Sequence, residues 1–134
     1  MKKGKIYEFD PVIYPTRVWV AEKGITLEEI DKEFEAICDD KSGCSFKENH
    51  TLPDFSTGGE TYVVGHKKLG LMGCLVVLYT PREAKILSHE ADHCADWLFQ
   101  YIGETTRSYN GGECYAYYQS WVFDCLYKVW RGKV

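Results

Sequence analysis

The chain has 134 residues, a length that favours one domain with a single hydrophobic core. Its net charge is −4, and its lysines and arginines form no cluster beyond Lys2, Lys3 and Lys5, which disfavours nucleic-acid binding. No run reaches the roughly 18 apolar residues of a membrane span, and the first residues lack the apolar stretch of a secretory signal. We therefore expect a soluble cytoplasmic protein with no nucleic-acid or membrane partner.

The six cysteines raise the question of disulfides, and they stand at positions 38, 44, 74, 94, 114 and 125. None forms a Cys-x-x-Cys pair, and no export signal precedes them, so we expect reduced, buried thiols. Cys38, Cys44 and His50 share one polar segment and are the candidates for a second metal site. Their spacing does not match a known tetrahedral ligand pattern, which makes that site the weaker expectation.

The first third of the chain predicts a strand and then a helix. In residues 17–21, Val18 and Val20 alternate with the other three side chains, as in a strand. Thr26 with Glu29 three positions later forms a capping box. The box opens a predicted helix of about 12 residues, whose buried stripe follows the helical period. The stripe consists of Leu27, Ile30, Phe34 and Ile37. Residues 38–60 show no periodicity, and a loop of that length is either functional or poorly ordered.

The second half predicts a hairpin and two helices. Strands over residues 61–67 and 73–80 are joined by a short glycine-bearing loop, and the apolar run from Cys74 to Tyr79 indicates a strand covered on both faces. A helix is predicted over residues 81–102, ended by Gly103. Its core stripe is Leu87, Ala91, Cys94, Leu98 and Ile102. The last helix buries Cys114, Tyr118, Trp121, Cys125 and Leu126 and presents Glu113, Tyr117, Ser120 and Asp124 on the opposite side.

The candidate site lies in the first of these two helices, in the sequence His-Glu-x-x-His at residues 89–93. His89 and His93 are four residues apart, so their side chains share one helix face and can bind one tetrahedral cation. Glu90 projects about 100° further around the helix, within reach of a water held by that cation. A carboxylate residue, Glu113, follows His93 by 20 residues at the start of the last helix. An exposed helix face that binds nothing is the alternative.

With these residues the chain resembles the gluzincins, the zincin metallopeptidases with a glutamate ligand. In the thermolysin-like members the third ligand also follows the second histidine by 20 residues. The order strand, helix, hairpin, motif helix and glutamate helix is similar to that of a minimal zincin. More loosely, the chain looks like short zincin-like proteins of bacteriophages, whose setting is the host cytoplasm or the virion. The resemblance is specific over residues 74–121 and implies zinc held by His89, His93 and Glu113, with Glu90 as general base.

The chain departs from the thermolysin-like pattern at two points. That pattern places an aspartate four residues after the ligand glutamate to orient a histidine ligand, and Tyr117 stands there in this chain. Asp96 and Asp124 are the other candidates for that role, because ligand histidines donate their second N–H to a carboxylate or carbonyl. No segment corresponds to the one that stabilises the oxyanion in larger members. By residue type alone, the oxyanion candidates are Tyr109, Tyr115, Tyr117 and His66.

We therefore expect an α+β fold, a single domain in which a small mixed sheet packs on two or three helices. The expected function is zinc-dependent hydrolysis of a peptide or protein substrate that lies antiparallel to an edge strand of the hairpin. The alternative is a zincin-fold structural or interaction protein, possible in a phage setting, whose metal site is structural or vestigial. Glu90 favours the enzyme, because a purely structural site needs no base at that position.

Overall fold

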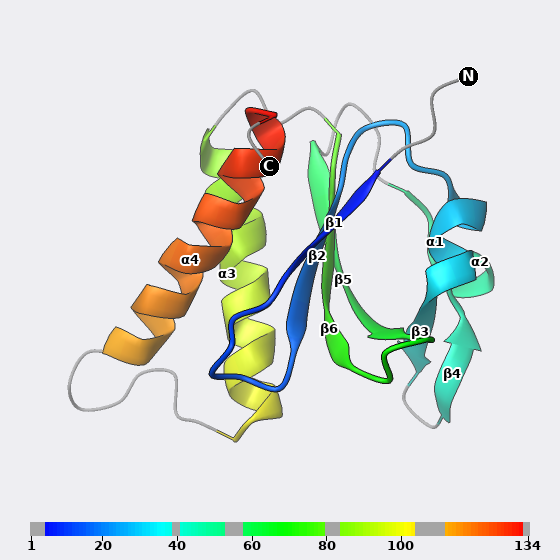
Figure 1. Cartoon of the computed structure of the whole chain (residues 1–134), viewed down its shortest axis with the longest axis horizontal. Helices are drawn as coiled ribbons and strands as arrows, with labels where there is room; N and C mark the ends of the chain where they lie inside the picture. The colour runs from blue at the N-terminus through cyan, green and yellow to red at the C-terminus, as the bar shows by residue number, and fades with distance from the viewer. Residues whose placement is uncertain (1–4, 39–40, 53–57, 80–83, 104–111, 133–134) are drawn as a thin grey trace.

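The computed structural model describes residues 5–38, 41–52, 58–79, 84–103 and 112–132. It has the α+β architecture expected from the sequence, with one six-stranded mixed sheet and helices on both of its faces (Figure 1). In chain order the elements are β1 (Ile6–Phe9), β2 (Arg17–Ala21), α1 (Leu27–Glu33), β3 (Phe34–Cys38), β4 (Lys41–Ser45), α2 (Phe46–Asn49), β5 (Gly59–His66), β6 (Met72–Leu78), α3 (Ala84–Tyr101) and α4 (Glu113–Trp130).

The strand order in the sheet is β1-β2-β6-β5-β3-β4. Only β2 and β6 run parallel to each other, and every other neighbouring pair is antiparallel. The predicted hairpin is confirmed, since β5 and β6 pair in antiparallel register from Gly59↔Leu78 to Gly65↔Met72. The β5–β6 hairpin therefore occupies the middle of the sheet rather than its edge.

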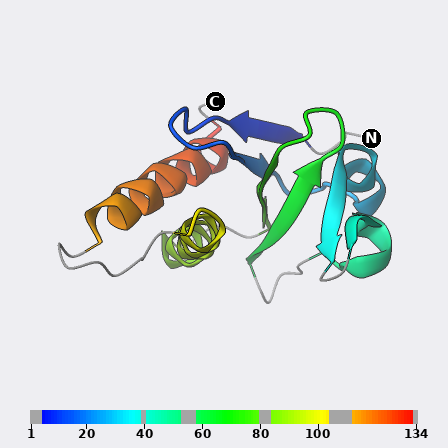
Figure 2. The same cartoon turned by 90° about the horizontal axis from the view of Figure 1, so that it is seen from below.

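The two faces of the sheet carry separate cores, as Figures 1 and 2 show. Helices α3 and α4 cover one face, where they pack on Val18, Val20 and Val76. Helices α1 and α2 belong to the opposite face, where Trp19 and Leu75 lie in the second core. Because successive side chains of a strand point to opposite faces, β2 and β6 supply both cores. This explains the nearly continuous apolar run of β6, whose residues from Gly73 to Leu78 are all buried.

The helix predicted after Thr26 is shorter than expected. Its capping box is confirmed, because the Thr26 hydroxyl accepts a hydrogen bond from the Glu29 N–H and the Glu29 carboxylate accepts one from the Thr26 N–H. The helix ends at Glu33, however, and Phe34 begins β3, which pairs with β5. Phe34 is fully buried in the strand conformation, in edge contact with the ring of Trp19. Sheet pairing and this aromatic contact therefore override the helical period.

The prediction of one long loop over residues 38–60 is wrong. The segment contains β4, the short helix α2 and the first residues of β5, while residues 39–40 and 53–57 lie outside the described part. The Ser45 hydroxyl caps α2 by accepting a hydrogen bond from the Glu48 N–H, and Phe46 is fully buried beneath the sheet. The polar composition of the segment thus did not predict a short helix held by one buried aromatic side chain.

The cysteines agree only in part with the expectation of reduced, buried thiols. Cys74, Cys94 and Cys125 are free and buried, and Cys114 is free but exposed. Cys44 is disulfide-bonded, so the prediction is wrong for this residue, and a disulfide sulfur cannot serve as a thiolate ligand in the second metal site considered above. The exposure of Cys114 follows from its place in the first turn of α4, beyond the edge of the core.

The two long helices match their predicted positions well. Residues 81–83 of the predicted motif helix lie outside the described part, and α3 runs from Ala84 to Tyr101. Gly103 follows with a φ of +76°, the left-handed conformation expected of a helix-ending glycine. Among the helices that the structure describes, none has both the length and the apolar character to cross a bilayer.

Gly73 is required by the packing of Trp19 across the sheet. A Cβ atom at this position would lie 2.0 Å from the Arg17 carbonyl oxygen and 2.8 Å from the indole ring of Trp19. Backbone of a paired strand cannot move away without breaking its ladder. Gly65 in β5 is different, because a Cβ there would meet only the flexible end of Ile37 at 3.8 Å.

We expect Gly73→Ala to lower the free energy of unfolding by about 1 to 3 kcal/mol, the range of a forced overpacking in a core. Gly65→Ala is the matched control, and we expect it to change stability by less than about 1 kcal/mol. Urea denaturation of both variants measures the difference. Equal stability of the two variants would contradict the packing of Trp19 against Gly73.

Candidate functional site

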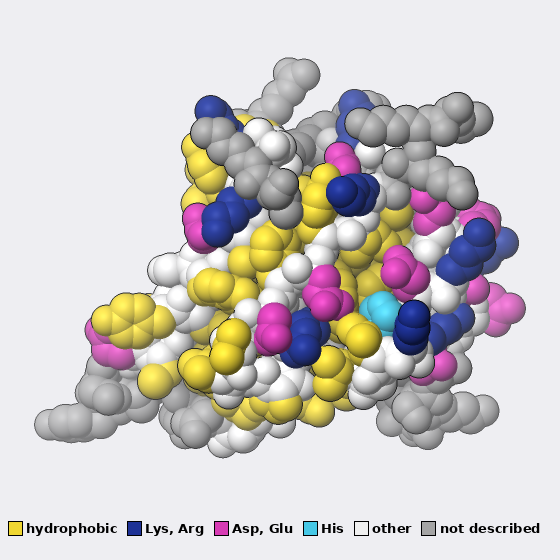
Figure 3. Space-filling model, viewed as in Figure 1, with side chains coloured by type: hydrophobic (Ala, Val, Ile, Leu, Met, Phe, Trp, Pro, Cys, Tyr) yellow, Lys and Arg dark blue, Asp and Glu magenta, His cyan; other side chains and the backbone are white. Residues whose placement is uncertain are grey.

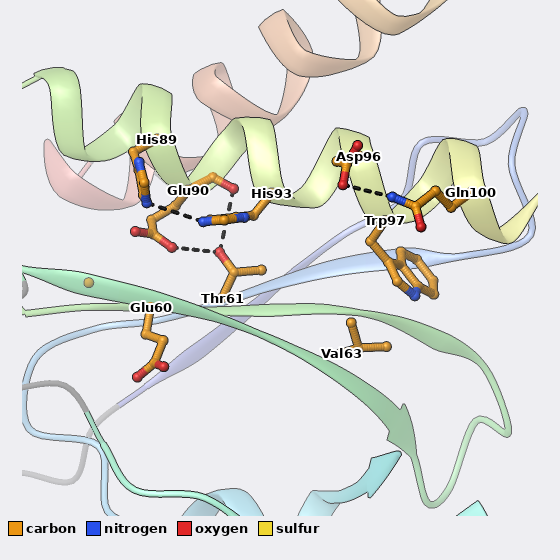
Figure 4. Close-up of a pocket in the computed structure, with 10 residues that line it drawn as sticks. Glu60, Thr61, Val63, His89, Glu90, His93, Asp96, Trp97 and Gln100 are labelled. Carbon is orange, nitrogen blue, oxygen red and sulfur yellow. Dashed lines mark hydrogen bonds between the residues drawn. The ribbon is translucent and has the colours of Figure 1, made fainter. Parts of the chain in front are cut away.

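Helix α3 places the two histidines of the motif on its exposed side and turns its apolar stripe to the sheet. Leu87, Ala91, Cys94 and Leu98 are fully buried, as the sequence predicted. His89 and His93 are exposed, and their Nε2 atoms lie 3.1 Å apart. Their rings meet edge to face, with centroids 4.7 Å apart. The two Nε2 atoms therefore lie within hydrogen-bond distance of each other in front of the helix (Figure 4).

Glu90 lies between the histidines in sequence and is buried, with 4% of its surface exposed. Its carboxylate points from α3 toward β5, where the Thr61 hydroxyl donates a hydrogen bond of 2.8 Å to Oε1 (Figure 4). The second carboxylate oxygen receives no hydrogen bond from the described residues. A buried carboxylate needs hydrogen bonds to offset the loss of hydration. Thr61 supplies one of them and fixes the direction in which the carboxylate points.

A cleft of about 720 Å³ opens between α3 and β5. Its α3 side carries His89, Glu90 and His93, and its β5 side carries Gly59 and Thr61. The three motif residues thus share one solvent-accessible cavity with a strand backbone. That combination of a concave surface, convergent polar groups and a buried carboxylate is typical of a binding or catalytic site.

Within the described part of the chain, the strand that borders the cleft is paired along most of one edge and only at the end of the other. Along one edge, β5 pairs with β6 over residues 59–65. Along the other edge, β3 pairs only with the stretch from Val64 to His66. Within the described part of the chain, no strand covers the second edge over residues 59–63. Free backbone N–H and C=O groups at such an edge can bind an extended chain.

The histidine pair fits a metal ion. Two imidazole nitrogens bound to one tetrahedral zinc at 2.0–2.1 Å stand roughly 3.3 Å apart, close to the 3.1 Å between the two Nε2 atoms. The described residues, however, hold no group of three or more His, Cys, Asp or Glu side chains arranged to bind one ion. Glu113 is the first residue of α4 and is exposed. Its role as the third ligand therefore stays a prediction.

The packing of α4 against α3 is fixed near the motif by a different residue. The Tyr115 hydroxyl donates a hydrogen bond of 2.6 Å to the Asp92 carboxylate, and its ring lies 5.6 Å from that of Phe99. Tyr115 was predicted as an oxyanion candidate, but in the structure its hydroxyl donates to Asp92 and links the two helices. Asp92 was not singled out in the sequence, although it lies inside the motif. No sequence signal pairs it with Tyr115, because that contact depends on how the two helices cross.

The other candidates lie as follows. Asp96 lines the cleft and accepts a hydrogen bond of 2.8 Å from Gln100. Asp124 pairs with Lys128 at 3.1 Å on α4, and Tyr117 is 72% exposed. His66 stacks on Trp19 in the sheet, and Tyr109 lies outside the described residues. Of those candidates that the structure describes, it brings only Asp96 into the cleft that holds the motif.

Thr61 is the functional residue that sequence reasoning missed. The strand was predicted, and strand alternation places Thr61 and Val63 on one face. Nothing in the sequence indicates which strand faces the motif helix, because that depends on the strand order. A threonine in the strand that pairs with the strand before the motif is the only available signal.

The thiols behind the site are not nucleophiles. A hydrogen bond with Cys74 and complete burial raise the pKa of the Cys94 thiol well above its ordinary value. Burial likewise raises the pKa of Cys125 to about 12. A thiol reacts as its thiolate, so both remain protonated and unreactive near neutral pH. Neither of these two thiols therefore adds a nucleophile to the region.

Comparison with known proteins adds no identification. No protein-family model, curated protein or solved structure gives a significant match to this chain.

The Thr61–Glu90 hydrogen bond predicts a measurable coupling. We expect Thr61→Val to lower the free energy of unfolding by about 1 to 3 kcal/mol, because it leaves a buried carboxylate without its donor. In a Glu90→Leu background the same change should have a much smaller effect. Urea denaturation of the four proteins in this double-mutant cycle measures the coupling.

Thr51→Val, which alters an exposed threonine on the opposite side of β5, serves as the control and should be nearly neutral. Additive effects of Thr61→Val and Glu90→Leu would show that the two side chains do not interact in solution.

Proposed function

We propose that the chain is a zinc-dependent hydrolase of peptide bonds, with Glu90 as its general base. The observation that carries this proposal is the position of the Glu90 carboxylate, buried at the wall of the cleft beside two convergent imidazoles. A structural staple has no use for a buried, oriented carboxylate next to its ligands. General acid–base catalysis does, since the base must be held within hydrogen-bond reach of the proton it takes.

His89 and His93 would hold the metal, and Glu113 is proposed as the ligand that completes the set. Two neutral imidazoles and one carboxylate leave a divalent site with a net positive charge. When bound there, zinc acts as a Lewis acid on a carbonyl and lowers the pKa of a water molecule. Glu113 would reach the histidines only if the first turn of α4 lies closer to the motif than in this structure.

The protein's own groups account for the proton transfers. Glu90 takes a proton from the attacking water and passes it to the amine of the departing peptide segment, so the carboxylate is regenerated at the end of the cycle. Thr61 keeps Oε1 occupied with a donated hydrogen bond at 2.8 Å, which leaves the other oxygen for the water. Thr61 is therefore a positioning residue in this proposal.

The unpaired edge of β5 would bind the substrate backbone. An extended peptide that pairs with residues 59–63 continues the sheet and passes directly in front of Glu90 and the histidines. Its main-chain hydrogen bonds give affinity without regard to sequence, and the alternate side chains point into the cleft. An antiparallel direction, as expected from the sequence, fits the antiparallel pairing of β5 with both of its neighbours.

A second candidate function is that of a structural or interaction protein whose metal site is structural or vestigial. The absence of a third ligand beside the histidines in the described part of the chain favours it. A hydrophobic surface favours it too: Val12, Ile13 and Tyr117 are 83%, 78% and 72% exposed. Figure 3 shows hydrophobic side chains reaching the surface on this side of the molecule. Ile13 and Tyr117 line a small cavity of about 290 Å³ next to α4.

The turn that presents this surface is strained. The Ile13 N–H donates to the Pro11 carbonyl at 2.7 Å, and Val12 between them has a φ of +70°. A β-branched residue rarely adopts that conformation. Asp10 holds the turn by accepting a hydrogen bond from the Val12 N–H at 2.8 Å and by pairing with Arg17 at 3.3 Å. Strain maintained at an exposed apolar turn is consistent with a contact surface.

The two candidate functions differ in what Glu90→Gln does. In the hydrolase, the variant should bind zinc as the wild type does. It should cleave peptides at least about 10²-fold more slowly, because it lacks the base but keeps the shape of the side chain. Digestion of a peptide library at equal zinc content measures this. Glu48→Gln, the same change on α2 across the sheet, is the control and should leave cleavage unchanged.

Cleavage that persists in Glu90→Gln would contradict the role of Glu90. A zinc-loaded wild type that cleaves no peptide across varied libraries would favour the structural or interaction protein.

A further inference from the structure

The cleft has a marked charge asymmetry, and this inference rests on the proposed function of the same cleft. Its lining includes the acidic residues Glu60, Glu90 and Asp96 and no lysine or arginine among the described residues. The lysine nearest to the motif along α3, Lys85, lines a smaller, adjoining cavity that shares His89 and Glu90 with the cleft. The part of the cleft that continues past His93 is therefore negative, and it disfavours an acidic side chain there.

An aromatic wall stands beside this negative charge. Trp97 projects from α3 into the cleft toward Val63 of β5 (Figure 4). The indole stacks on Tyr101 with centroids 4.9 Å apart and planes inclined by 17°, which holds its orientation. Trp97 and Val63 together make an apolar slot suited to the aliphatic stem of a long side chain. The indole face also attracts a cation placed over it.

Asp96 is held in place at the same end of the cleft. Gln100 donates a hydrogen bond of 2.8 Å from its side-chain amide to Asp96 Oδ2 (Figure 4). Oδ1 receives no hydrogen bond from the described residues. Gln100 thus orients the carboxylate without neutralising it, so that it can accept hydrogen bonds from an ammonium or guanidinium group.

The register of β5 places this slot relative to the reacting atoms. Thr61 contacts Glu90, and Val63 faces Trp97, so the two positions are two residues apart on one face of β5. Two residues of strand span about 6.6 Å. In a peptide antiparallel to β5, the residue opposite Val63 comes two positions before the residue opposite Thr61, and both side chains point into the cleft.

We infer that Asp96, Trp97 and Val63 form a specificity pocket for a lysine or arginine side chain on the amino-terminal side of the cleaved bond, about two residues before it. The stem of the basic residue lies between Trp97 and Val63, and its charged group reaches Asp96. The substrate class is thus an extended basic peptide.

The test uses two readouts, so that failure of the pocket and failure of the proposed hydrolase are distinguishable. The first is the set of sequences that zinc-loaded wild type cleaves in a random peptide library. We expect lysine and arginine to be enriched about fivefold to tenfold at one position before the cut, the combined effect of an exposed ion pair and a cation–π contact. Asp96→Asn should remove most of this enrichment, whereas Asp124→Asn on α4 should retain it.

The second readout is binding to the zinc-loaded Glu90→Gln variant, which does not require cleavage. The probes are two peptides that differ only in arginine against its neutral isostere citrulline. We expect the arginine peptide to bind about fivefold tighter at low salt, with the difference reduced at high salt and in the Glu90→Gln/Asp96→Asn double variant.

Cleavage without basic enrichment would overturn the pocket and leave the hydrolase intact. Absence of cleavage would overturn the hydrolase. In that case, tighter binding of the arginine peptide that depends on Asp96 would support the pocket alone, and equal binding of the two peptides would overturn it.

Discussion

The hydrogen bond from Thr61 to the buried carboxylate of Glu90 ties the motif helix to the sheet. Glu90 has 4% of its surface exposed, and a carboxylate that loses hydration on burial needs hydrogen-bond donors in place. The donor comes from β5, a strand that pairs with the strand directly before the helix. The sheet order, the direction in which α3 lies and the cleft between them are all linked to this contact. Moving α3 by one turn would leave Glu90 without Thr61.

The cores on the two faces explain why α3 can hold this position. Leu87, Ala91, Cys94 and Leu98 fill the space above β2 and β6, so the helix is fixed by apolar packing along its length. Trp19 and its neighbours fill the opposite face, with Gly73 leaving space for the indole. The histidines then project from a rigid element beside the edge of β5 that no described strand covers over residues 59–63. A site built on a packed helix and strand is held more accurately than one built on loops.

The sequence predicted the features that depend on local chemistry. The capping box of Thr26 and Glu29, the strand over residues 17–21 and the left-handed Gly103 are all present. Phe34 and Ile37 fitted the helical stripe equally well, yet Phe34 belongs to a strand, because its burial against Trp19 involves residues far away in the chain. The α2 helix and the contact of Thr61 with Glu90 also depend on residues far away in the chain. The sequence does not show which of these residues become neighbours in the fold.

In the candidate site, too, one part depends on local spacing and another on how the chain folds. The spacing of His89 and His93 fixes their relative position on any helix, and in the structure their Nε2 atoms lie 3.1 Å apart. Glu113 is linked to them only by a count of residues, and a count does not specify the path of the intervening chain. In the structure the contact between the two helices near the motif is made by Tyr115 and Asp92. The third ligand is therefore the part of the proposal that most needs a direct measurement.

X-ray absorption at the zinc edge of the zinc-loaded protein tests the central claim most directly, because it reports the number and kind of ligands. The account predicts two imidazole nitrogens at about 2.0–2.1 Å and a carboxylate oxygen at about 2.0–2.2 Å. One imidazole should be lost in His93→Ala, and the carboxylate should be lost in Glu113→Ala. Zinc without imidazole ligands, or a ligand set unchanged in both variants, would contradict it.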